Sequence, residues 1–219
     1  NGGGIEILFH GPEKVIFNFC QFLNNFASQK IERETISEHQ NDGIMFVDFI
    51  SCLFRNNEAF GKGGAIFIQK VENLVILNCS FNCNKANQRC KKTFRGGLGG
   101  AIYYKSTFSP KCQLNSVQIS DCTFTSNSAF DGFSLYIECE EKNQKYLTFS
   151  LIKNIFTKNY QNGSIEKDAH KNDRAVIATE FAQIIEKENV LTENEVKLFS
   201  HVDSKGNPIQ SFSRRLKQD

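Results

Sequence analysis

Short apolar runs recur along this chain, and their side chains alternate with period two. The runs are Val15-Ile16-Phe17, Met45-Phe46-Val47, Leu74-Val75-Ile76-Leu77, Val117-Gln118-Ile119 and Leu147-Thr148-Phe149. Alternation of this kind in β-branched and aromatic residues is typical of β-strands rather than of helices. We therefore expect a strand at each run.

A fixed phrase follows each run, with Phe two residues after Cys, Asn five residues after it and Ala seven residues after it. Four copies are intact, and a degraded fifth copy carries Asn154 where the others carry Cys. Its members are Cys20, Cys52, Cys79 and Cys122; Phe22, Phe54, Phe81, Phe124 and Phe156; and Asn25, Asn57, Asn84, Asn127 and Asn159. A constant phrase with spacers of variable length indicates stacked structural repeats.

Glycine-containing segments between the phrases form a second recurring signal. They are Gly3-Gly4-Ile5, Asp42-Gly43-Ile44, Gly63-Gly64-Ala65-Ile66, Gly99-Gly100-Ala101-Ile102 and Asp131-Gly132-Phe133. Glycine suits a bend that needs positive φ or close backbone approach, and the apolar residues after it suit a new strand. Each unit then reads as strand, bend, strand, bend, with no room for a helix.

Strands that return without crossover helices favour an all-β fold, a right-handed parallel β-helix of about five coils. Coils in such a stack lie ~4.8 Å apart, so equivalent residues form columns. We expect the phenylalanines of the phrase to stack in the core and the asparagines to form a ladder of amide hydrogen bonds at a bend. The cysteines of the phrase are expected to be small, buried, unpaired thiols.

The combination of Gly-Gly-Ala-Ile, complete at 63–66 and 99–102, with Phe-x-x-Asn in all five phrases resembles the repeat of the polymorphic membrane protein family. That family is best known as surface proteins of chlamydiae, and similar repeats occur in protist surface proteins. The resemblance covers roughly residues 2–163. It implies a β-helix of the pectin-lyase-like type that serves as an adhesin or passenger region.

The chain divides on this reading into repeats over residues 1–163 and a non-repetitive segment over residues 164–219. The second segment is more charged and lacks the phrase, and we expect it to cap the last coil and to end in a flexible tail. A partner-binding extension is the alternative. Residues 179–187 have helix-compatible spacing, and Thr192 with Glu195 resembles a capping box, although a strand through 196–202 fits nearly as well.

Composition narrows the functional classes. The 219 residues are 40% hydrophobic and 23% charged, which is typical of a globular protein, and the net charge of +2 gives no pull towards nucleic acid. No stretch approaches the ~20 apolar residues of a membrane-spanning helix. The chain starts at Asn1 without Met, so we expect it to be a processed product or a piece of a longer protein. Membership of a larger assembly is a further expectation.

Catalytic and metal sites are not expected. Enzymes with a parallel β-helix gather carboxylates on one outer face, whereas Asp42, Asp48, Asp121 and Asp131 fall at different positions of the repeat. The acidic run Glu138, Glu140 and Glu141 reads as a solvated loop. The four histidines, His10, His39, His170 and His201, lie far apart, and no motif for a cofactor is present.

Four further cysteines, Cys83, Cys90, Cys112 and Cys139, lie outside the repeated position. In an extracellular protein they are candidates for disulfides, as Cys83–Cys90 with Cys112–Cys139 or in either other pairing; in an intracellular protein they stay reduced. Two Asn-x-Ser sequons make Asn78 and Asn162 candidates for glycosylation, and Asn78 should face solvent because it precedes the inward cysteine.

These observations predict a non-enzymatic module, on a cell surface or secreted, that works by adhesion or display and contacts other proteins or surface glycans. The alternative is a structural subunit docked in a larger intracellular assembly. That alternative requires reduced cysteines and unmodified Asn78 and Asn162.

Overall fold

The computed structural model describes residues 3–8, 14–27, 46–69, 71–87, 97–106, 115–138, 147–161, 176–180, 183–192 and 199–202. These residues form 23 β-strands and no helix, and every described strand pair is parallel. The expectation of an all-β protein with parallel strands is therefore confirmed.

The strands form four sheets, named A to D. Sheet A contains β1 (Ile5–Leu8), β8 (Ile66–Gln69), β12 (Ile102–Lys105), β16 (Leu135–Glu138), β20 (Ile177–Glu180) and β23 (Phe199–Val202). Sheet B contains β2 (Lys14–Asn18), β5 (Phe46–Ile50), β9 (Asn73–Leu77), β13 (Asn115–Ser120), β17 (Leu147–Ile152) and β21 (Gln183–Lys187). Sheet C contains β3 (Gln21–Leu23), β6 (Leu53–Arg55), β10 (Ser80–Asn82), β14 (Thr123–Thr125), β18 (Ile155–Thr157) and β22 (Val190–Thr192). Sheet D contains β4 (Phe26–Ala27), β7 (Glu58–Phe60), β11 (Lys85–Asn87), β15 (Ser128–Ala129) and β19 (Tyr160–Gln161).

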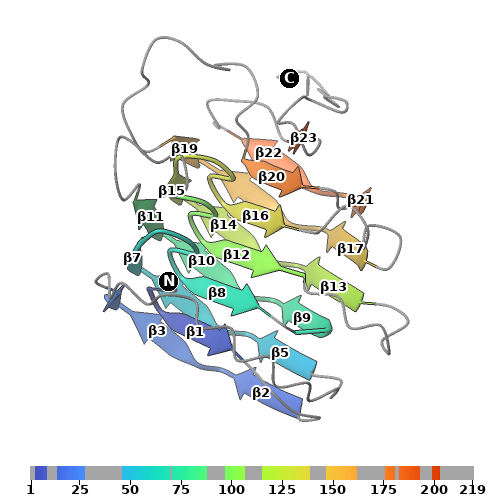
Figure 1. Cartoon of the computed structure of the whole chain (residues 1–219). Helices are drawn as coiled ribbons and strands as arrows, with labels where there is room; N and C mark the ends of the chain where they lie inside the picture. Colours follow the sequence, from blue (N-terminus) through green and yellow to red (C-terminus); the bar gives the residue numbers. More distant parts are fainter. Residues whose placement is uncertain are drawn as a thin grey trace, which may run out of the picture.

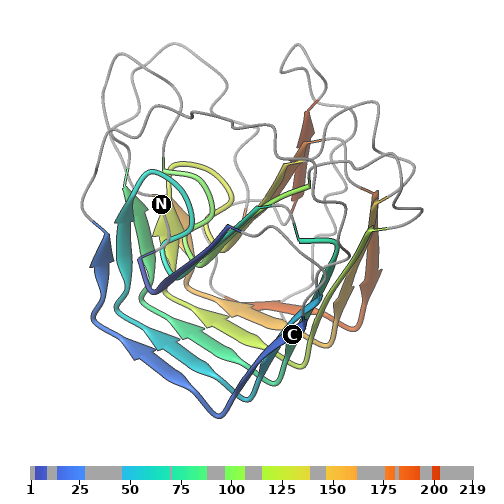
Figure 2. The ribbon, with the colours of Figure 1, turned by 60° about the horizontal axis from the view of Figure 1, so that its bottom comes forward.

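From β8 onward the chain visits sheets A, B, C and D in that order and then returns to sheet A. Each new strand pairs with the strand of the previous visit, so the repeats lie side by side from one end of the molecule to the other (Figure 1). The view in Figure 2 shows the sheets as walls around a common interior. The inward residues of sheets A, B and C fill that interior as one hydrophobic core.

The phenylalanines of the phrase form a column inside this core. Phe22, Phe54, Phe81, Phe124 and Phe156 stack with ring centroids 4.7–4.8 Å apart and planes within 8° of parallel. The spacing equals the separation of neighbouring strands, because the register pairs each ring with the equivalent ring of the next repeat. A second pair, Phe17 and Phe49, stacks in the same way in sheet B.

The asparagines of the phrase form a hydrogen-bond ladder at the bend between sheets C and D. The backbone N–H and the side-chain Nδ2 of Asn25, Asn57, Asn84 and Asn127 each donate to Oδ1 of the next asparagine at 2.9–3.1 Å. From Asn57 onward, Nδ2 also donates to the phenylalanine carbonyl of the preceding repeat at 2.8–3.0 Å. These buried amides are therefore satisfied by their neighbours.

Single residues in the left-handed conformation make the bends at either end of sheet C. Their φ values lie between 53° and 57°, although none is glycine: Phe19, Ser51, Asn78, Asp121, Lys153 and Glu188 precede sheet C, and Asn24, Asn56, Cys83, Ser126 and Lys158 follow it. Such residues carry a conformational cost, which the hydrogen bonds of the adjacent buried column offset. The bends are consequently of constant length in every repeat.

Glycine is required where sheet D leads into sheet A. A Cβ atom on Gly64 would lie 2.0 Å from the carbonyl oxygen of Gly100, and a Cβ on Gly100 would lie 2.0 Å from that of Phe133. The preceding Gly63 and Gly99 have φ of 66° and 67°. The doublets are thus explained by close approach of neighbouring repeats and by positive φ.

The first strand lies outside the sequential order. β1 pairs directly with β8, and Gly3 approaches Glu58 of the second repeat in the way that Gly64 approaches Lys85 of the third. The N-terminal strand therefore completes sheet A at the second repeat, although β2 to β4, which follow it in sequence, form the first. The expected strand start at Asp42-Gly43-Ile44 lies outside the described residues.

The helix expected over residues 179–187 is wrong, because Ile177–Glu180 and Gln183–Lys187 are strands that extend sheets A and B. Asn189 and Leu191 then occupy the Cys and Phe positions of a sixth phrase, so the described residues here are repetitive. Apolar residues in consecutive pairs are compatible both with a helix and with a strand that has one buried face. Here the segment forms strands because it pairs with the strands of the fifth repeat. Residues 193–198 and 203–219 lie outside the described part of the chain, and a cap there stays a prediction.

The fifth phrase is not degraded in its hydrogen bonding. Asn154 takes the cysteine position, accepts from the Cys122 N–H at 3.0 Å and donates from its own N–H and Nδ2 to Asn189 at 2.9 and 3.0 Å. Its Nδ2 also donates to the Ile119 carbonyl. The Asn154 amide thus replaces a thiol in the cysteine column, where a small inward side chain accepts a hydrogen bond from the backbone N–H of the preceding repeat.

We expect Phe81→Ala to lower the free energy of unfolding by about 3–5 kcal/mol, because it removes a fully buried ring from the middle of the stack. Phe19→Ala is the matched control, since the Phe19 side chain is 76% exposed, and should change stability by less than about 0.5 kcal/mol. Urea unfolding followed by circular dichroism measures both. Equal effects would contradict the packing described.

Asn84→Asp should destabilise the protein more at pH 7 than at pH 4. The new carboxylate oxygen would face the Phe54 carbonyl and the Asn127 Oδ1, which are both acceptors. This raises the pKa of the carboxyl in the folded state, so the folded state binds more protons and stability falls as pH rises above about 4. Asn78→Asp, at an exposed bend, should show no such dependence. Urea midpoints across this pH range give the answer.

Candidate functional site

A second aromatic cluster lies on the outer face of sheet A. Phe67, Tyr103 and Tyr136 occupy equivalent outward positions, and their rings stack with centroids 5.3 and 5.7 Å apart. Leu98 and Ala178 pack against them. The Tyr103 side chain is 0% exposed, so sheet A is buried on both faces at this point.

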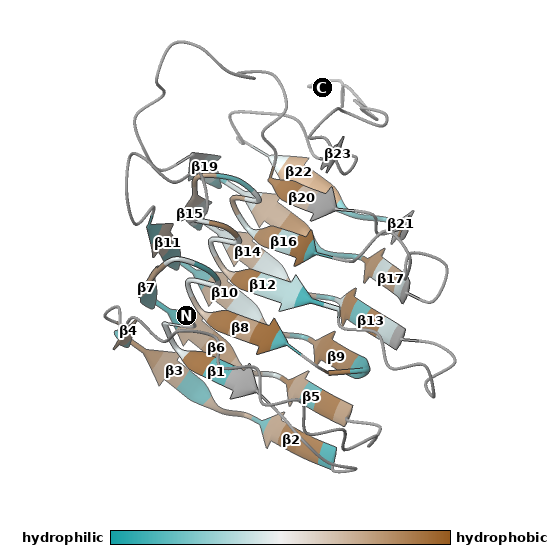
Figure 3. Cartoon of the chain, viewed as in Figure 1, coloured by the Kyte–Doolittle hydropathy of each residue, from teal (hydrophilic) through white to brown (hydrophobic). Residues whose placement is uncertain are grey.

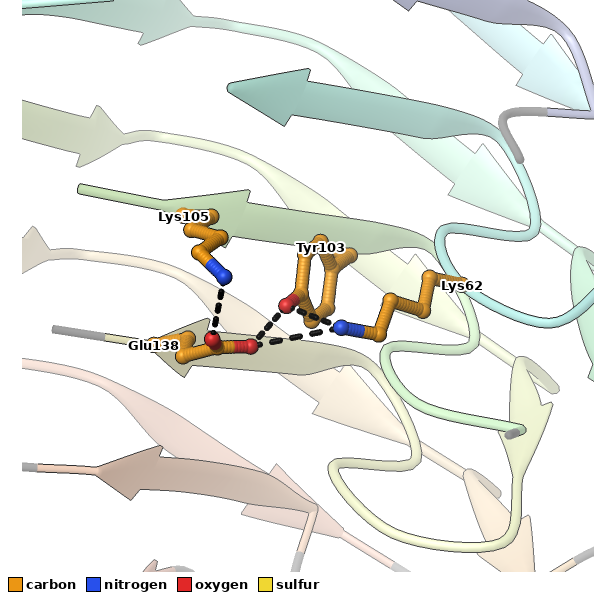
Figure 4. Close-up of polar contacts among 4 residues, drawn as sticks. All are labelled: Lys62, Tyr103, Lys105 and Glu138. Atoms are coloured by element: carbon orange, nitrogen blue, oxygen red, sulfur yellow. Dashed lines mark hydrogen bonds and ion pairs between the residues drawn. The ribbon is translucent and has the colours of Figure 1, made fainter. Parts of the chain in front are cut away.

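Beside this cluster lie four polar side chains that we call the Lys62–Glu138 cluster: Lys62, Tyr103, Lys105 and Glu138 (Figure 4). The Glu138 carboxylate accepts from Lys105 Nζ at 2.8 Å, from Lys62 Nζ at 3.3 Å and from the Tyr103 hydroxyl. Lys62 Nζ also donates to Tyr103 Oη at 2.5 Å and lies 4.3 Å from the centroid of its ring. Three successive repeats are thereby joined through one carboxylate.

Electrostatics favour the ionised form of Glu138. Burial of this side chain, which is 23% exposed, opposes ionisation, but the positive charge of Lys62 and the hydrogen bonds from Lys105 and Tyr103 outweigh it. The pKa of Glu138 consequently lies below its usual value. Two ammonium groups on one carboxylate make the cluster an ion-pair clamp between neighbouring repeats.

The expectation that Glu138 belongs to a solvated loop is wrong, because it is the last residue of β16 and faces Lys105 across the strand pair. Glu140 and Glu141 lie outside the described residues. The ion pair of Glu138 could have been predicted by aligning the segments that follow the glycine bends. In that alignment, Ile102-Tyr103-Tyr104-Lys105 and Leu135-Tyr136-Ile137-Glu138 occupy the same positions. That alignment places a lysine next to a glutamate on adjacent strands.

The cysteines of the phrase form a buried column at the bend between sheets B and C. The N–H of Cys52 donates to Sγ of Cys79, and that of Cys79 to Sγ of Cys122, both at 3.3 Å. Each of these thiols also donates to a backbone carbonyl, for example Cys52 to Ile50 at 3.3 Å. Burial raises the pKa of the Cys52 thiol to about 11 and raises that of Cys122 as well, whereas the hydrogen bond with Cys122 lowers the pKa of Cys79. Because all three thiols are buried, we interpret them as structural hydrogen-bonding groups.

The cysteines outside the phrase are placed only in part. Cys83 is an exposed free thiol at the bend between sheets C and D, and its Sγ donates to Asn82 Oδ1 at 3.0 Å. Cys90, Cys112 and Cys139 lie outside the described residues, so disulfide pairing stays a prediction.

The two candidate glycosylation sites are likewise placed only in part. Asn78 is exposed at the bend before sheet C, where its Nδ2 donates to Ser51 Oγ at 3.1 Å. Asn162 lies outside the described residues. Modification of either asparagine stays a prediction.

The carboxylates examined in the sequence lie on different surfaces. Asp48 of sheet B pairs with Lys14 at 2.8 Å, Asp121 is exposed at a bend before sheet C, and Asp131 precedes β16. Asp42 is not among the described residues. Within the described ranges, no group of three or more His, Cys, Asp and Glu side chains is arranged to hold a metal ion.

Comparison with known proteins adds no identity: no protein family, curated protein or solved structure matches this chain significantly. In the part of the chain that the structure describes, no helix has the length and apolar character needed to cross a membrane.

Glu138→Gln should lower the free energy of unfolding at pH 7 by about 1–3 kcal/mol, because charge-assisted hydrogen bonds to both lysines are weakened. Since the folded pKa of Glu138 is depressed, its contribution is present above the unfolded pKa of about 4.3 and is lost as pH falls through the folded pKa. The difference between wild type and variant should therefore shrink in acid.

Glu188→Gln serves as the control for this measurement. Glu188 forms exposed ion pairs with Lys153 and Lys187, and exposed pairs contribute little. Thermal unfolding of wild type and of both variants, measured from pH 7 to pH 3, gives the stability difference at each pH. A pH-independent loss in Glu138→Gln would contradict the ion-pair interpretation.

Among the described cysteines, Cys83 should be alkylated first by a maleimide at pH 8 in the native protein. Cys52, Cys79 and Cys122 should react only after unfolding in urea, because they are buried in the core. Peptide mass spectrometry of timed samples reads all four sites. Equal rates at Cys83 and Cys79 would show that the column opens readily.

Proposed function

We propose that the chain is a right-handed parallel β-helix of the pectin-lyase-like type that acts as a non-enzymatic scaffold for adhesion or display. The cyclic order of the sheets, the parallel pairing and the stacked columns support the fold. The repeat's resemblance to polymorphic membrane proteins supports a place on a cell surface or outside the cell. Other proteins or surface glycans are the proposed partners.

One observation carries this proposal: in the described part of the chain, the differences in repeat length lie at the two borders of sheet A. The path through sheets B, C and D is constant, with Lys14 to Ala27 matching Phe46 to Ala59 and Asn73 to Ala86. By contrast, the link from sheet A to sheet B spans residues 70–72 in one repeat and 106–114 in the next, and the link from sheet D to sheet A spans 61–65 and then 88–101.

This distribution separates a rigid frame from variable segments. Sheets B and C cannot change length without breaking the buried amide and thiol columns at their bends. The borders of sheet A carry no such constraint, so insertions accumulate there and can supply recognition. A scaffold with its variation on one side suits display better than it suits enclosure of a substrate.

The non-enzymatic role is supported by the placement of the acidic residues. Hydrolysis or elimination on a polysaccharide needs carboxylates close together on one exposed face. Of the carboxylates weighed in the sequence, Asp48, Asp121 and Asp131 lie on different faces, and Glu138 is engaged by two lysines and a tyrosine. No cofactor or metal is proposed.

A structural subunit of a larger intracellular assembly is the second candidate. Exposed apolar residues on the outer faces of sheets B and C favour it, including Ile16, Ile155 and Ile185. Flat sheet faces of this kind can dock against neighbouring subunits. In that setting the thiols stay reduced and Asn78 stays unmodified.

Variants of the full chain can distinguish the two roles. A display variant replaces residues 107–114 and 139–146 with short glycine–serine links, and a face variant carries Gln118→Lys and Ser150→Lys, which lie side by side on the outside of sheet B. Labelled proteins are added to intact cells of the source organism and to a glycan array. We expect the display variant to lose about tenfold or more in binding and the face variant to match wild type.

The reverse pattern would favour the assembly subunit. Cross-linking mass spectrometry on native material then gives an independent reading. Cross-links to glycoproteins of the surface, with glycosylated Asn78, support display; cross-links to a few constant subunits, with unmodified Asn78 and alkylatable cysteines, support assembly. Wild type that binds neither cells nor glycans and has no reproducible neighbour contradicts both proposals.

A further inference from the structure

A column of thiols lies at the bend between sheets B and C. Cys52, Cys79 and Cys122 are at most 2% exposed, and Cys20 is partly buried. Strands β5 and β9 of sheet B, which lead into this column, are largely hydrophobic (Figure 3). Sulfur atoms, which are ligands of soft metal ions, are therefore held in a row inside an apolar core.

The surroundings of the thiols repeat, and this fixes the distance between them. Each of the three buried Sγ atoms contacts one carbonyl oxygen of its own repeat and one of the preceding repeat. The carbonyls of the same repeat belong to Ile50, Leu77 and Ser120, at 3.1–3.3 Å. Those of the preceding repeat belong to Phe17, Phe49 and Ile76, at 3.4–3.6 Å. Side chains with equivalent contacts in successive repeats are related by the strand separation, so neighbouring Sγ atoms lie ~4.8 Å apart.

This separation suits a metal ion bound linearly between two sulfurs. With the ~2.3 Å of a zinc–thiolate bond as a guide, two collinear metal–sulfur bonds span ~4.6 Å. The N–H of Cys79 reaches the Sγ of Cys122 at 3.3 Å, so no side chain separates these two residues. An ion can therefore bridge the two sulfurs with little movement of the backbone.

The number of ligands selects the class of ion. Structural zinc takes four ligands, and calcium takes six to eight oxygens. Within the described ranges, no three His, Cys, Asp or Glu side chains are arranged to hold a metal ion. Two thiolates without further ligands suit a soft monovalent ion that accepts two ligands. Copper(I) is the ion of this kind that cysteine sulfur selects.

Charge is the main cost of such a site. A lone thiolate is unfavourable in the core, and burial raises the pKa of Cys122 for this reason. A copper(I) ion between two thiolates leaves a single negative charge on the group. The N–H groups of Cys52 and Cys79 donate to the Sγ of Cys79 and Cys122 at 3.3 Å, and they stabilise that remaining charge. The carbonyl oxygens of Leu77 and Ile76 beside the two sulfurs attract the cation.

We propose that Cys79 and Cys122 bind one copper(I) ion in a linear site of two sulfurs. Cys20 and Cys52 form a second pair of the same geometry, which is weaker because Cys20 is only partly buried. Each bound ion displaces two thiol protons, which pass to the solvent, and no electron is transferred. The display role proposed above uses no metal, so this site goes beyond that role and does not depend on it.

Copper(I) binding to the full chain tests the proposal. The folded chain is incubated to equilibrium without oxygen, with copper(I) and an excess of the chelator bicinchoninate, which competes for weakly held ions. Copper that stays with the protein after gel filtration is then counted per chain. We expect wild type to retain at least one ion, and X-ray absorption at the copper edge to show two sulfur ligands.

Cys122→Asn is the sharpest variant, because Asn154 already occupies the same position in the fifth repeat. The new amide can accept from the Cys79 N–H and donate to Asn154, so the column keeps its hydrogen bonds, and circular dichroism checks the fold. We expect Cys122→Asn and Cys79→Ser each to lose one copper ion per chain. The control Cys83→Ser removes an exposed thiol and should retain that ion.

Thermal unfolding gives a second measurement. Copper(I) should raise the unfolding temperature of wild type and of Cys83→Ser, because the ion binds only the folded column, but not that of Cys122→Asn. Three results would overturn the proposal: wild type that retains no copper, equal retention by wild type and Cys122→Asn, and a bound ion with nitrogen or oxygen ligands. Loss of the ion in Cys83→Ser alone would place it at surface thiols and would reject the column.

Discussion

Hydrogen bonding between equivalent residues of adjacent repeats is the constraint on which this structure depends. Asn57, Asn84 and Asn127 each give their N–H groups to the next asparagine and take the corresponding hydrogen bonds from the previous one. A buried amide is tolerated only when all its groups are satisfied, so the ladder forces each repeat into the same register. Register in turn places the phenylalanine rings at 4.7–4.8 Å and the thiols in one column.

The same constraint divides the molecule into invariant and variable parts. Left-handed bends at Asn56, Cys83 and Ser126 are kept because the neighbouring amides hold them, although none of these residues is glycine. Neighbouring repeats contact each other at sheet A through close backbone approach at Gly64 and Gly100 and through the Lys62–Glu138 cluster, which lies outside the core. Its borders are free of buried columns, and the differences in repeat length lie there.

The sequence predicts the Phe and Asn columns of the core, but it does not predict the structure of the first strand or of the last repeat. Spacing of Phe81 and Asn84 within the phrase predicts that equivalent residues stack, because strand separation turns a sequence repeat into a spatial one. The sequence pattern does not reveal the sixth phrase, because Asn189 and Leu191 replace Cys and Phe and because the spacing of residues 179–187 also fits a helix. β1 could not be placed either, since its pairing with β8 depends on which sheet lacks a strand rather than on any local pattern. Glu138 was missed because ion pairs across strands become visible only after the repeats are aligned.

The displaced first strand has a consequence for the order in which the chain folds. Ile5 pairs with Ile66, so β1 gains its neighbour only when β8, the first strand of the third repeat, has been made, whereas β2, β3 and β4 gain theirs from the second repeat. During synthesis at roughly 5–20 residues per second, the N-terminal segment stays unpaired for several seconds while the repeats behind it assemble. β1 is thus locked in place after β2, β3 and β4, although it precedes them in the chain.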